Sequence, residues 1–271
     1  MDLSALKHAL SDIQLGGLRT FDTIGSTNDE AIAWADAGCA DFSLVIADEQ
    51  TRGRGRFDRR WVTRPGASLA FSLILTPSPA ELPLLPLFAP LCGLAIWQAL
   101  KDRYGIPTEI KWPNDILLHR RKCSGILVEA AWNESRLQAV VLGIGINIRE
   151  DSIPPADLQM FPASFLNSAS DLPIDRFELL AAVLHTIHAW RPKMGSPEFY
   201  QTWQVHLAFK GEQVAIVQSP KPSIIGVIEG IDGAGRLVLR ESDGKLQYIE
   251  VGDVHLRQAG EQTEKEKDHA G

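Results

Sequence analysis

An arginine- and glycine-rich segment between two apolar runs limits most strongly how this chain can fold. The runs Ser43-Leu-Val-Ile-Ala47 and Ser68-Leu-Ala-Phe-Ser-Leu-Ile-Leu75 are typical of buried β-strands, so residues 48–61 must form a long loop between them. Arginine offers a planar fork of donors to carboxylate and phosphate oxygens, and glycine lets the backbone approach a ligand closely. We therefore expect this loop to bind a small anion; the alternatives are a solvated basic turn or a docking patch for nucleic acid or a targeting receptor. Its arginines are Arg52, Arg54, Arg56, Arg59 and Arg60, and its glycines are Gly53 and Gly55.

The composition limits the partners of the chain. With 271 residues, of which 45% are hydrophobic and 23% are charged, the chain can form one large domain, or one medium and one small domain. Its formal net charge of −7 disfavours nucleic acid and anionic membranes, so any anion site must be local. Three cysteines without paired spacing indicate reduced thiols in a cytoplasm and argue against a zinc site. We expect no signal peptide, because the N-terminus has no basic flank followed by an apolar core, and no membrane span, because prolines interrupt the most apolar window, residues 82–95.

The segment Ser26-Thr-Asn-Asp-Glu30 predicts the start of a helix that ends at Gly38. Thr27 and Glu30 have the spacing of a capping box, in which side chains satisfy the free backbone donors of the first turn. A helix N-terminus also attracts a carboxylate or a phosphate. Residues 26–28 could therefore bind a ligand, or they could only cap the helix.

Apolar spacing predicts the other elements. Gly143 and Gly145 stand inside a strand-like run, but the third glycine and the following helix of a dinucleotide-binding fingerprint are missing. Glycines in such a strand indicate that another group lies close against the backbone. Residues 151–172 predict a loop with one short helical stretch, and the last dozen residues predict a disordered tail. Helices are expected at 84–104, 175–190 and 198–206, and strands at 108–112, 115–118, 124–130, 137–148, 213–217, 224–231, 235–240 and 246–251; the last four strands predict a small antiparallel barrel of about 50 residues.

Five motifs, in this order and spacing, resemble the biotin protein ligases. They are Ser26-Thr-Asn28, Gln50 with Gly53-Arg-Gly-Arg56 and Trp61, Lys111-Trp-Pro-Asn-Asp115, Arg121-Lys-Cys-Ser-Gly-Ile-Leu127, and Gly143-Ile-Gly-Ile-Asn147. The resemblance covers most of residues 20–257. The chain departs from the family at Asp58, where many members carry a glycine. We also expect no N-terminal DNA-binding domain of the kind found in bifunctional repressor members, and hence no transcriptional control.

The resemblance implies an α+β fold. In this family a mixed, mostly antiparallel sheet is flanked by helices, as in class II synthetases, and a small SH3-like β-barrel follows it. The implied organisation is a short N-terminal segment (1–20), a catalytic domain (21–208), an SH3-like domain (209–257) and a disordered tail (258–271).

The resemblance also implies an activity. Members join biotin to ATP as biotinyl-5′-AMP, release pyrophosphate, and pass the biotinyl group to a lysine of a biotin carboxyl carrier domain. The carboxylate and the α-phosphate repel each other, so cations must hold them together. Mg²⁺ is expected to come with the nucleotide, without a dedicated metal cage on the protein. A cytoplasmic enzyme is expected, and a homodimer paired through an edge at residues 136–141 is a further hypothesis.

Roles for individual residues follow from the same resemblance. The catalytic candidates are Arg56, Lys122 and Lys111. Lys111 could instead pair with Asp115 to fix a turn, and Asp115 could help to hold Mg²⁺ or orient the incoming lysine. The expected biotin-binding residues are Ser26, Thr27, Asn28, Gln50, Gly53, Arg54, Gly55, Arg56, Lys122 and Gly125. The expected ATP- or adenylate-binding residues are Arg54, Arg56, Trp61, Lys122 and Asn147.

Two other functions fit part of this pattern. A lipoate or octanoate ligase or transferase shares the fold and the carboxylate chemistry, but a fatty chain would leave the donors at residues 26–28 and Gln50 unpaired, at about 1–3 kcal/mol each. A non-catalytic module that senses biotin or binds nucleic acid is the alternative from another class. The acidic balance argues against nucleic acid.

Overall fold

The computed structural model describes residues 1–155, 159, 161–171, 173–218 and 221–256. The chain divides into two compact units, Met1–Ala208 and a second unit that begins at Phe209. Residues 1–20, which we set apart from the catalytic domain, lie in the first unit. Helix α1 (Leu3–Ala9) packs there against helix α4 (Arg176–Trp190), and Leu6 of α1 is buried. The expected tail, residues 258–271, lies outside the described residues.

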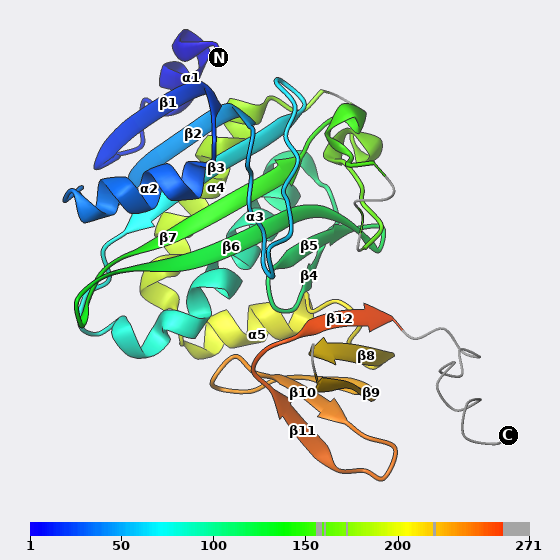
Figure 1. Ribbon diagram of the computed structural model, residues 1–271. Helices are drawn as coiled ribbons and strands as arrows, with labels where there is room; N and C mark the ends of the chain where they lie inside the picture. The colour runs from blue at the N-terminus through cyan, green and yellow to red at the C-terminus, as the bar shows by residue number, and fades with distance from the viewer. Residues whose placement is uncertain (156–158, 160, 172, 219–220, 257–271) are drawn as a thin grey trace, which may run out of the picture. The chain divides into compact units, whose positions relative to one another are not determined.

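A seven-stranded sheet forms the centre of the first unit (Figure 1). Only β1 and β2 pair in parallel, and every other pair of neighbours is antiparallel. The mixed, mostly antiparallel sheet of the expected α+β fold is therefore confirmed. In their order across the sheet, the strands are β1 (Gly17–Ile24), β2 (Ser43–Gln50), β3 (Ser68–Leu75), β7 (Arg136–Asn147), β6 (Arg121–Asn133), β5 (Asp115–Leu118) and β4 (Glu109–Lys111).

Helices cover both faces of this sheet. Helix α2 (Thr27–Asp36) lies in front of β2, β3 and β7, while α3 (Phe88–Tyr104) and α4 lie behind the sheet (Figure 1). Strand β3 is buried on both faces, which explains why it reads as a continuous apolar run. Helix α5 (Pro197–Val205) packs against α3, and short 3₁₀ helices lie at η1 (Leu82–Leu87), η2 (Glu150–Ser152), η4 (Leu166–Ala169) and η5 (Arg191–Lys193).

The segment Leu82–Tyr104 is long and apolar enough to cross a membrane by length and composition alone. Most of it is buried inside the first unit, and Leu91, Leu94, Ile96 and Leu100 are fully inaccessible to solvent. Its apolar side chains thus form part of the core behind the sheet. The helix begins at Phe88 rather than at residue 84, because residues 82–87 form a 3₁₀ turn that contains two prolines.

The expected capping of α2 is wrong in one detail. Ser26, not Thr27, is the N-cap, and its Oγ accepts a hydrogen bond from Asp29 N at 3.5 Å. Glu30 takes no part in a capping box and instead lies 2.6 Å from the guanidinium of Arg19 on β1. The helix ends at Asp36, two residues before the expected Gly38, and Gly38 adopts a left-handed conformation.

The expected dimer edge at residues 136–141 is wrong for its last two residues. Val140 and Val141 pair with β3 on one side and with β6 on the other, so they are inside the sheet. With β3 on one side and β6 on the other, these two residues have no free strand edge. A homodimer remains a hypothesis.

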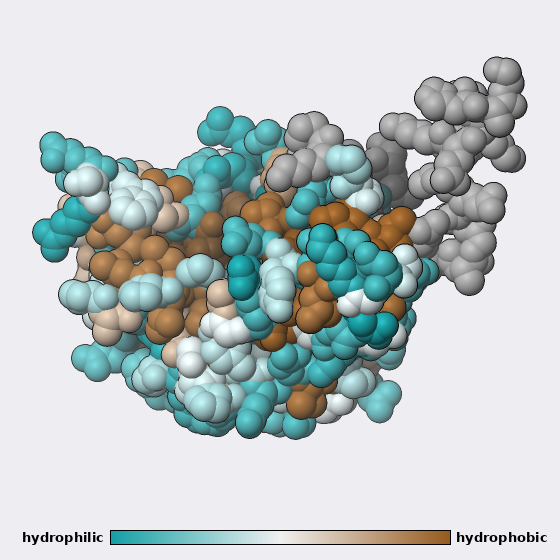
Figure 2. Space-filling view, turned by 90° about the horizontal axis from the view of Figure 1, so that it is seen from below, coloured by the Kyte–Doolittle hydropathy of each residue, from teal (hydrophilic) through white to brown (hydrophobic). Residues whose placement is uncertain are grey.

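The second unit is an antiparallel five-stranded sheet, and the four strands expected there are confirmed. The sequence did not reveal the fifth strand, β12, which pairs with β8. Apolar side chains such as Ile216 and Leu239 form its core, while Tyr248 and Val251 are exposed. Figure 2, a view of the whole chain, shows brown apolar areas among teal polar ones on one face of the molecule. In their order across the sheet, the strands are β11 (Leu246–Ile249), β10 (Leu237–Arg240), β9 (Lys221–Ile231), β8 (Gln213–Gln218) and β12 (Asp253–Leu256).

Arg191 joins three separate segments of the first unit. Its guanidinium lies 2.6 Å from Glu81 Oε1 and 2.7 Å from Asp41 Oδ2, and it donates to the carbonyl of Thr76. Burial alone would raise the pKa of Glu81, but hydrogen bonds from Arg191 and Ser78 outweigh it and hold that pKa below its ordinary value. Glu81 therefore stabilises the fold fully above the ordinary glutamate pKa of about 4.3, and this contribution is lost as the pH falls through the lower pKa of the folded state.

We expect Arg191→Met to lower the free energy of unfolding by about 1.5–3 kcal/mol at neutral pH, because charge-assisted hydrogen bonds are lost. Urea unfolding measures this loss, and the difference from the wild type should shrink as the pH falls below about 4. Arg103→Met removes the exposed ion pair with Glu178 and is the control, with an expected loss below about 1 kcal/mol. Equal losses in the two variants would contradict this account.

Candidate active site

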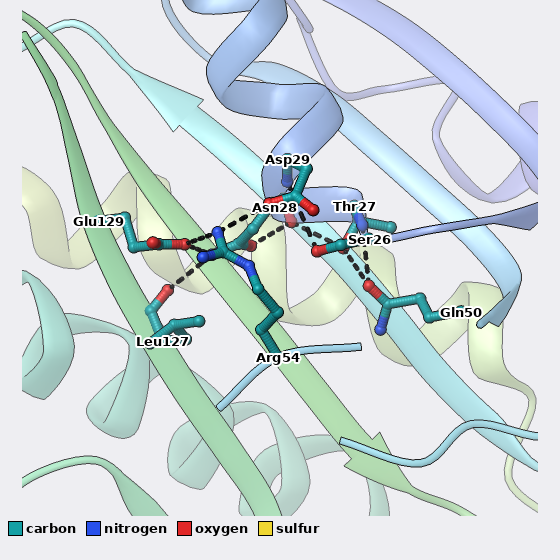
Figure 3. Close-up of polar contacts among 9 residues, drawn as sticks. Ser26, Thr27, Asn28, Asp29, Gln50, Arg54, Leu127 and Glu129 are labelled. Atoms are coloured by element: carbon teal, nitrogen blue, oxygen red, sulfur yellow. Dashed lines mark hydrogen bonds and ion pairs between the residues drawn. The ribbon is translucent and has the colours of Figure 1, made fainter. Parts of the chain in front are cut away.

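The first turn of α2 and the end of β2 form a buried polar group. Gln50, the last residue of β2, accepts hydrogen bonds with Oε1 from Thr27 N at 2.8 Å and from Thr27 Oγ1 at 3.0 Å (Figure 3). The parallel pairing of β1 with β2 places Gln50 beside Ile24, two residues before the N-cap Ser26. Within the described part of the chain, Gln50 Nε2 and the hydroxyl hydrogen of Ser26 have no acceptor, so both donors remain available to a ligand.

Asn28 is fixed in one orientation beside this group. Its Oδ1 accepts from Ser72 Oγ at 2.5 Å, and its Nδ2 donates to Glu129 Oε2 at 2.8 Å and to the carbonyl of Leu127 at 3.3 Å. A Cβ on Gly143 would lie 2.2 Å from Asn28 Oδ1, which is too close for any other residue. The expectation that a group lies against the glycines of β7 is therefore confirmed for Gly143.

Trp61 lies across the next two glycines. Gly125 on β6 pairs directly with Gly145 on β7, and a Cβ on Gly145 would be 2.2 Å from Trp61 Cε2. The Trp61 indole N–H is buried and has no hydrogen-bond partner among the described residues, so it is a donor that a ligand could satisfy. At Gly53, which accepts from Trp61 N at 3.0 Å, a Cβ would likewise clash with the Trp61 carbonyl.

The arginine loop folds back on itself in a narrow turn. Gly55 N donates to Arg59 O, Arg59 N donates to Arg56 O, and the two residues between them adopt positive φ angles of 56° at Phe57 and 57° at Asp58. Two such residues are typical of a type I′ turn, where glycine is favoured. Asp58 therefore adopts the conformation that the family's glycine would adopt with less strain.

The two central arginines of the loop point to different partners. Arg56 Nη1 donates to Asn114 Oδ1 at 3.1 Å, and Asn114 in turn donates to the carbonyl of Ile126. Arg54 instead lies 2.6 Å from Glu129 Oε2 and 2.9 Å from Asp29 Oδ1 (Figure 3). Arg54 thus belongs to the polar group at α2, whereas Arg56 lies beside the turn between β4 and β5.

A buried carboxylate lies between two lysines next to that turn. Lys122 Nζ is 2.6 Å from Asp115 Oδ1, and Lys111 Nζ is 3.4 Å from Asp115 Oδ2. Burial alone would raise the pKa of Asp115, but the positive charges of Lys122 and Lys111 outweigh it and hold that pKa below its ordinary value. Lys122 also lies over the ring of Trp61 at 5.7 Å. The cluster has one positive charge more than it has negative charges, which favours an anion.

Asn147 is the last residue of β7 and lies on the same side of the sheet as Lys122 and Asp115. Its Nδ2 donates to the carbonyl of Ser164 at 3.1 Å, and residues 162–164 pair with the backbone of Lys122. The Asn147 side chain thus satisfies a backbone carbonyl, and its expected contact with adenine stays a proposal.

The expected residues thus form two groups, one at α2 and one at Lys122 and Asp115, with Trp61 between them. Sequence analysis missed Ser72 and Glu129, which fix Asn28 and Arg54. Both interrupt apolar strand runs, and this interruption was the signal that could have identified them. Among the described residues, no three or more His, Cys, Asp or Glu side chains cluster as metal ligands.

Known proteins share both units. Residues 22–147 match the Biotin/lipoate A/B protein ligase family, and residues 210–257 match the Biotin protein ligase C terminal domain. The biotin--[acetyl-CoA-carboxylase] ligase of Paracoccus denitrificans is 33% identical over 240 residues, which cover 84% of this chain and 96% of that protein. The bifunctional ligase/repressor BirA of Bacillus spizizenii is also 33% identical over 240 residues, which cover 87% of this chain and 72% of BirA.

The fold agrees with these matches. The biotin protein ligase from Aquifex aeolicus, solved in complex with biotin and ATP, superposes with a TM-score of 0.74 and 27% identity, over 90% of this chain and 99% of that one. The ordered sequence motifs, the fold and the C-terminal sheet therefore have one common explanation: the chain belongs to the biotin protein ligase family.

Proposed function

We propose that this chain is an ATP-dependent biotin protein ligase. It joins the carboxylate of biotin to the α-phosphate of ATP, releases pyrophosphate, and transfers the biotinyl group from biotinyl-5′-AMP to a lysine of a biotin carboxyl carrier domain. The observation that carries the proposal is a pair of residue groups on one face of the sheet. Ser26 and Gln50 offer donors without an acceptor at one end, and Lys122 and Arg56 supply positive charge at the other. The glycines of β6 and β7 lie between the two groups. Cytoplasmic location and independence from nucleic acid are part of the proposal.

The polar group at α2 suits the fused urea of biotin. A urea oxygen needs donors, and the Ser26 hydroxyl and Gln50 Nε2 are uncommitted donors in a buried setting. Thr27 fixes the position of Gln50, and neither Thr27 nor Asn28 adds a free donor, because their own hydrogen bonds are already made. A ligand with only a fatty chain would leave the donors unpaired, and this distinguishes biotin from octanoate.

The cations at the other group suit the reacting anions. The carboxylate attacks the α-phosphate in line, and charge grows on the phosphoryl oxygens as pyrophosphate leaves. Lys122 and Arg56 would neutralise this charge, while Asp115 holds Lys122 in place and keeps Lys111 nearby. Removing one such donor typically costs about 10²–10³ in rate.

Mg²⁺ is proposed to arrive with the nucleotide. Asp115, the buried carboxylate beside Lys122, forms ion pairs with Lys122 and Lys111, so these side chains do not form a cation site of their own. When bound to the phosphates, the ion would neutralise part of their charge. We assign no further step to it.

One assay tests the function. The protein is incubated with ATP, Mg²⁺ and, separately, biotin, lipoate or octanoate, and the acyl-AMP is sought by mass spectrometry alongside ligand-dependent exchange of pyrophosphate into ATP. We expect biotinyl-AMP and biotin-dependent exchange only. An acyl-AMP from lipoate or octanoate alone would favour the lipoate-type activity, and no adduct from any of the three would reject both enzymes.

We expect Arg56→Gly to weaken retention of biotinyl-AMP, because the loop loses its cation beside the mixed anhydride. Free adenylate acylates stray amines, so the variant should biotinylate an unrelated protein such as serum albumin, measured by streptavidin blotting. Arg60→Gly is the control in the same loop, since the Arg60 side chain donates to the Thr51 carbonyl. Wild-type retention and selectivity in Arg56→Gly would remove Arg56 from this role.

Gly145→Ala should disrupt the site without changing any polar group. Its methyl would lie 2.2 Å from Trp61, so the indole must move, and we expect kcat/KM for biotin to fall on the order of 10²-fold. Initial rates of biotin-dependent exchange provide the measurement. Gly233→Ala is the control, because a Cβ there meets no atom within 4 Å. If both variants kept the wild-type kcat/KM, the close packing of Trp61 would not matter for binding.

A further inference from the structure

Glu129 connects the arginine loop to the polar group at α2. Its Oε2 lies 2.6 Å from Arg54 Nη2 and also accepts from Asn28 Nδ2 at 2.8 Å, so one carboxylate oxygen serves both side chains (Figure 3). Asp29 adds a second carboxylate 2.9 Å from the same Arg54 nitrogen. Neither of these two acidic residues is among the ligand-binding residues proposed above.

The two carboxylates change what Arg54 can do. Its guanidinium faces two negative charges, so a phosphate placed there would be repelled by both. An arginine held in this way serves as an anchor for its own segment rather than as an anion ligand. The loop is thus fastened at Arg54, while Arg56 two residues later reaches the group at Lys122.

Glu129 also determines how Asn28 is held. Hydrogen bonds to a carboxylate are roughly twice as strong as those between neutral groups, so Glu129 is the strongest of the three partners of the Asn28 amide. Without it, the amide keeps only Ser72 and the longer contact to the Leu127 carbonyl. Ser72 Oγ lies within hydrogen-bond distance of both Asn28 Oδ1 and Thr27 Oγ1, and Thr27 in turn donates to Gln50. A shift of the Asn28 amide is therefore passed on to the Gln50 donor for the urea ring.

We propose that Glu129 is a positioning residue that couples the ordering of the loop at residues 52–60 to the geometry of the biotin-ring site, through Arg54 on one side and Asn28 on the other. This inference rests on the proposed function. Filling the ring site steadies Asn28 and Glu129 and thereby fixes Arg54; a fixed Arg54 in turn holds the loop over the adenylate. Neither Glu129 nor Arg54 needs to touch the reacting atoms for this coupling.

A double-mutant cycle tests the coupling in the full-length chain. Glu129→Gln, Arg54→Met and the double variant are compared for the KM and kcat of biotin-dependent exchange, and for the fraction of biotinyl-AMP that escapes in a single turnover without acceptor. Glu30→Gln is the matched control, because Arg19 and Glu30 are also 2.6 Å apart, and their side chains are 40% and 26% exposed, against 39% and 26% for Arg54 and Glu129.

We expect Glu129→Gln to raise KM for biotin about tenfold and to increase escape of the adenylate, with kcat within about twofold of the wild type. Arg54→Met should raise KM about threefold, because Glu129 loses one of its two partners. In the double variant KM should not exceed that of Glu129→Gln, since both changes remove the same link. Glu30→Gln should match the wild type in both measurements.

Three results would overturn the proposal: KM effects that multiply in the double variant, a Glu129→Gln variant that behaves like Glu30→Gln, or a kcat that falls with unchanged KM. If Glu129→Gln does not fold, Arg54→Met decides alone, because its side chain is partly exposed on a loop; a wild-type KM then rejects the coupling. Absence of biotin-dependent exchange in the wild type would instead reject the proposed function, so the two failures are distinguishable.

Discussion

The site depends on side chains lying directly on the backbone of two neighbouring strands. Strands β6 and β7 carry glycine at the three positions where Asn28 and Trp61 approach, and a single methyl group at Gly143 or Gly145 would overlap them. The absence of these side chains lets one helix N-terminus and one loop meet on the same sheet face. The residues proposed to contact the ligand surround this strip of sheet, which is formed by Gly125, Gly143 and Gly145.

The charges around the strip are arranged in opposite ways at its two ends. At one end, the single carboxylate of Asp115 lies between Lys111 and Lys122, and the surplus positive charge suits the carboxylate and phosphates of the substrates. At the other end, two carboxylates surround one guanidinium, which suits a neutral urea and repels phosphate. This contrast supports the proposed orientation of biotin, which has one neutral and one anionic end.

The loop between β2 and β3 takes part in both ends. Arg54 of this loop is held by acidic side chains, and Arg56 donates to Asn114. At the end of the loop, Trp61 packs against the glycines of β6 and β7. The tight turn between Arg56 and Arg59 uses left-handed residues that are not glycine, so the conformation is maintained by its surroundings rather than by local preference. A loop fastened at both ends and strained at its tip is suited to respond to what binds beneath it.

Apolar periodicity in the sequence indicated the main helices and strands. The ordered motifs, through their resemblance to the biotin protein ligases, implied the fold class and named the candidate ligand-binding residues. The sequence also indicated, from glycines inside a strand, that another group lies on β7. Only the tertiary structure decided which group that is, why Ser26 rather than Thr27 caps α2, and how Arg54 differs from Arg56. Those outcomes depend on Glu129, Ser72 and Asn114, which approach from strands and turns distant in the chain, and no local pattern specifies such long-range pairs.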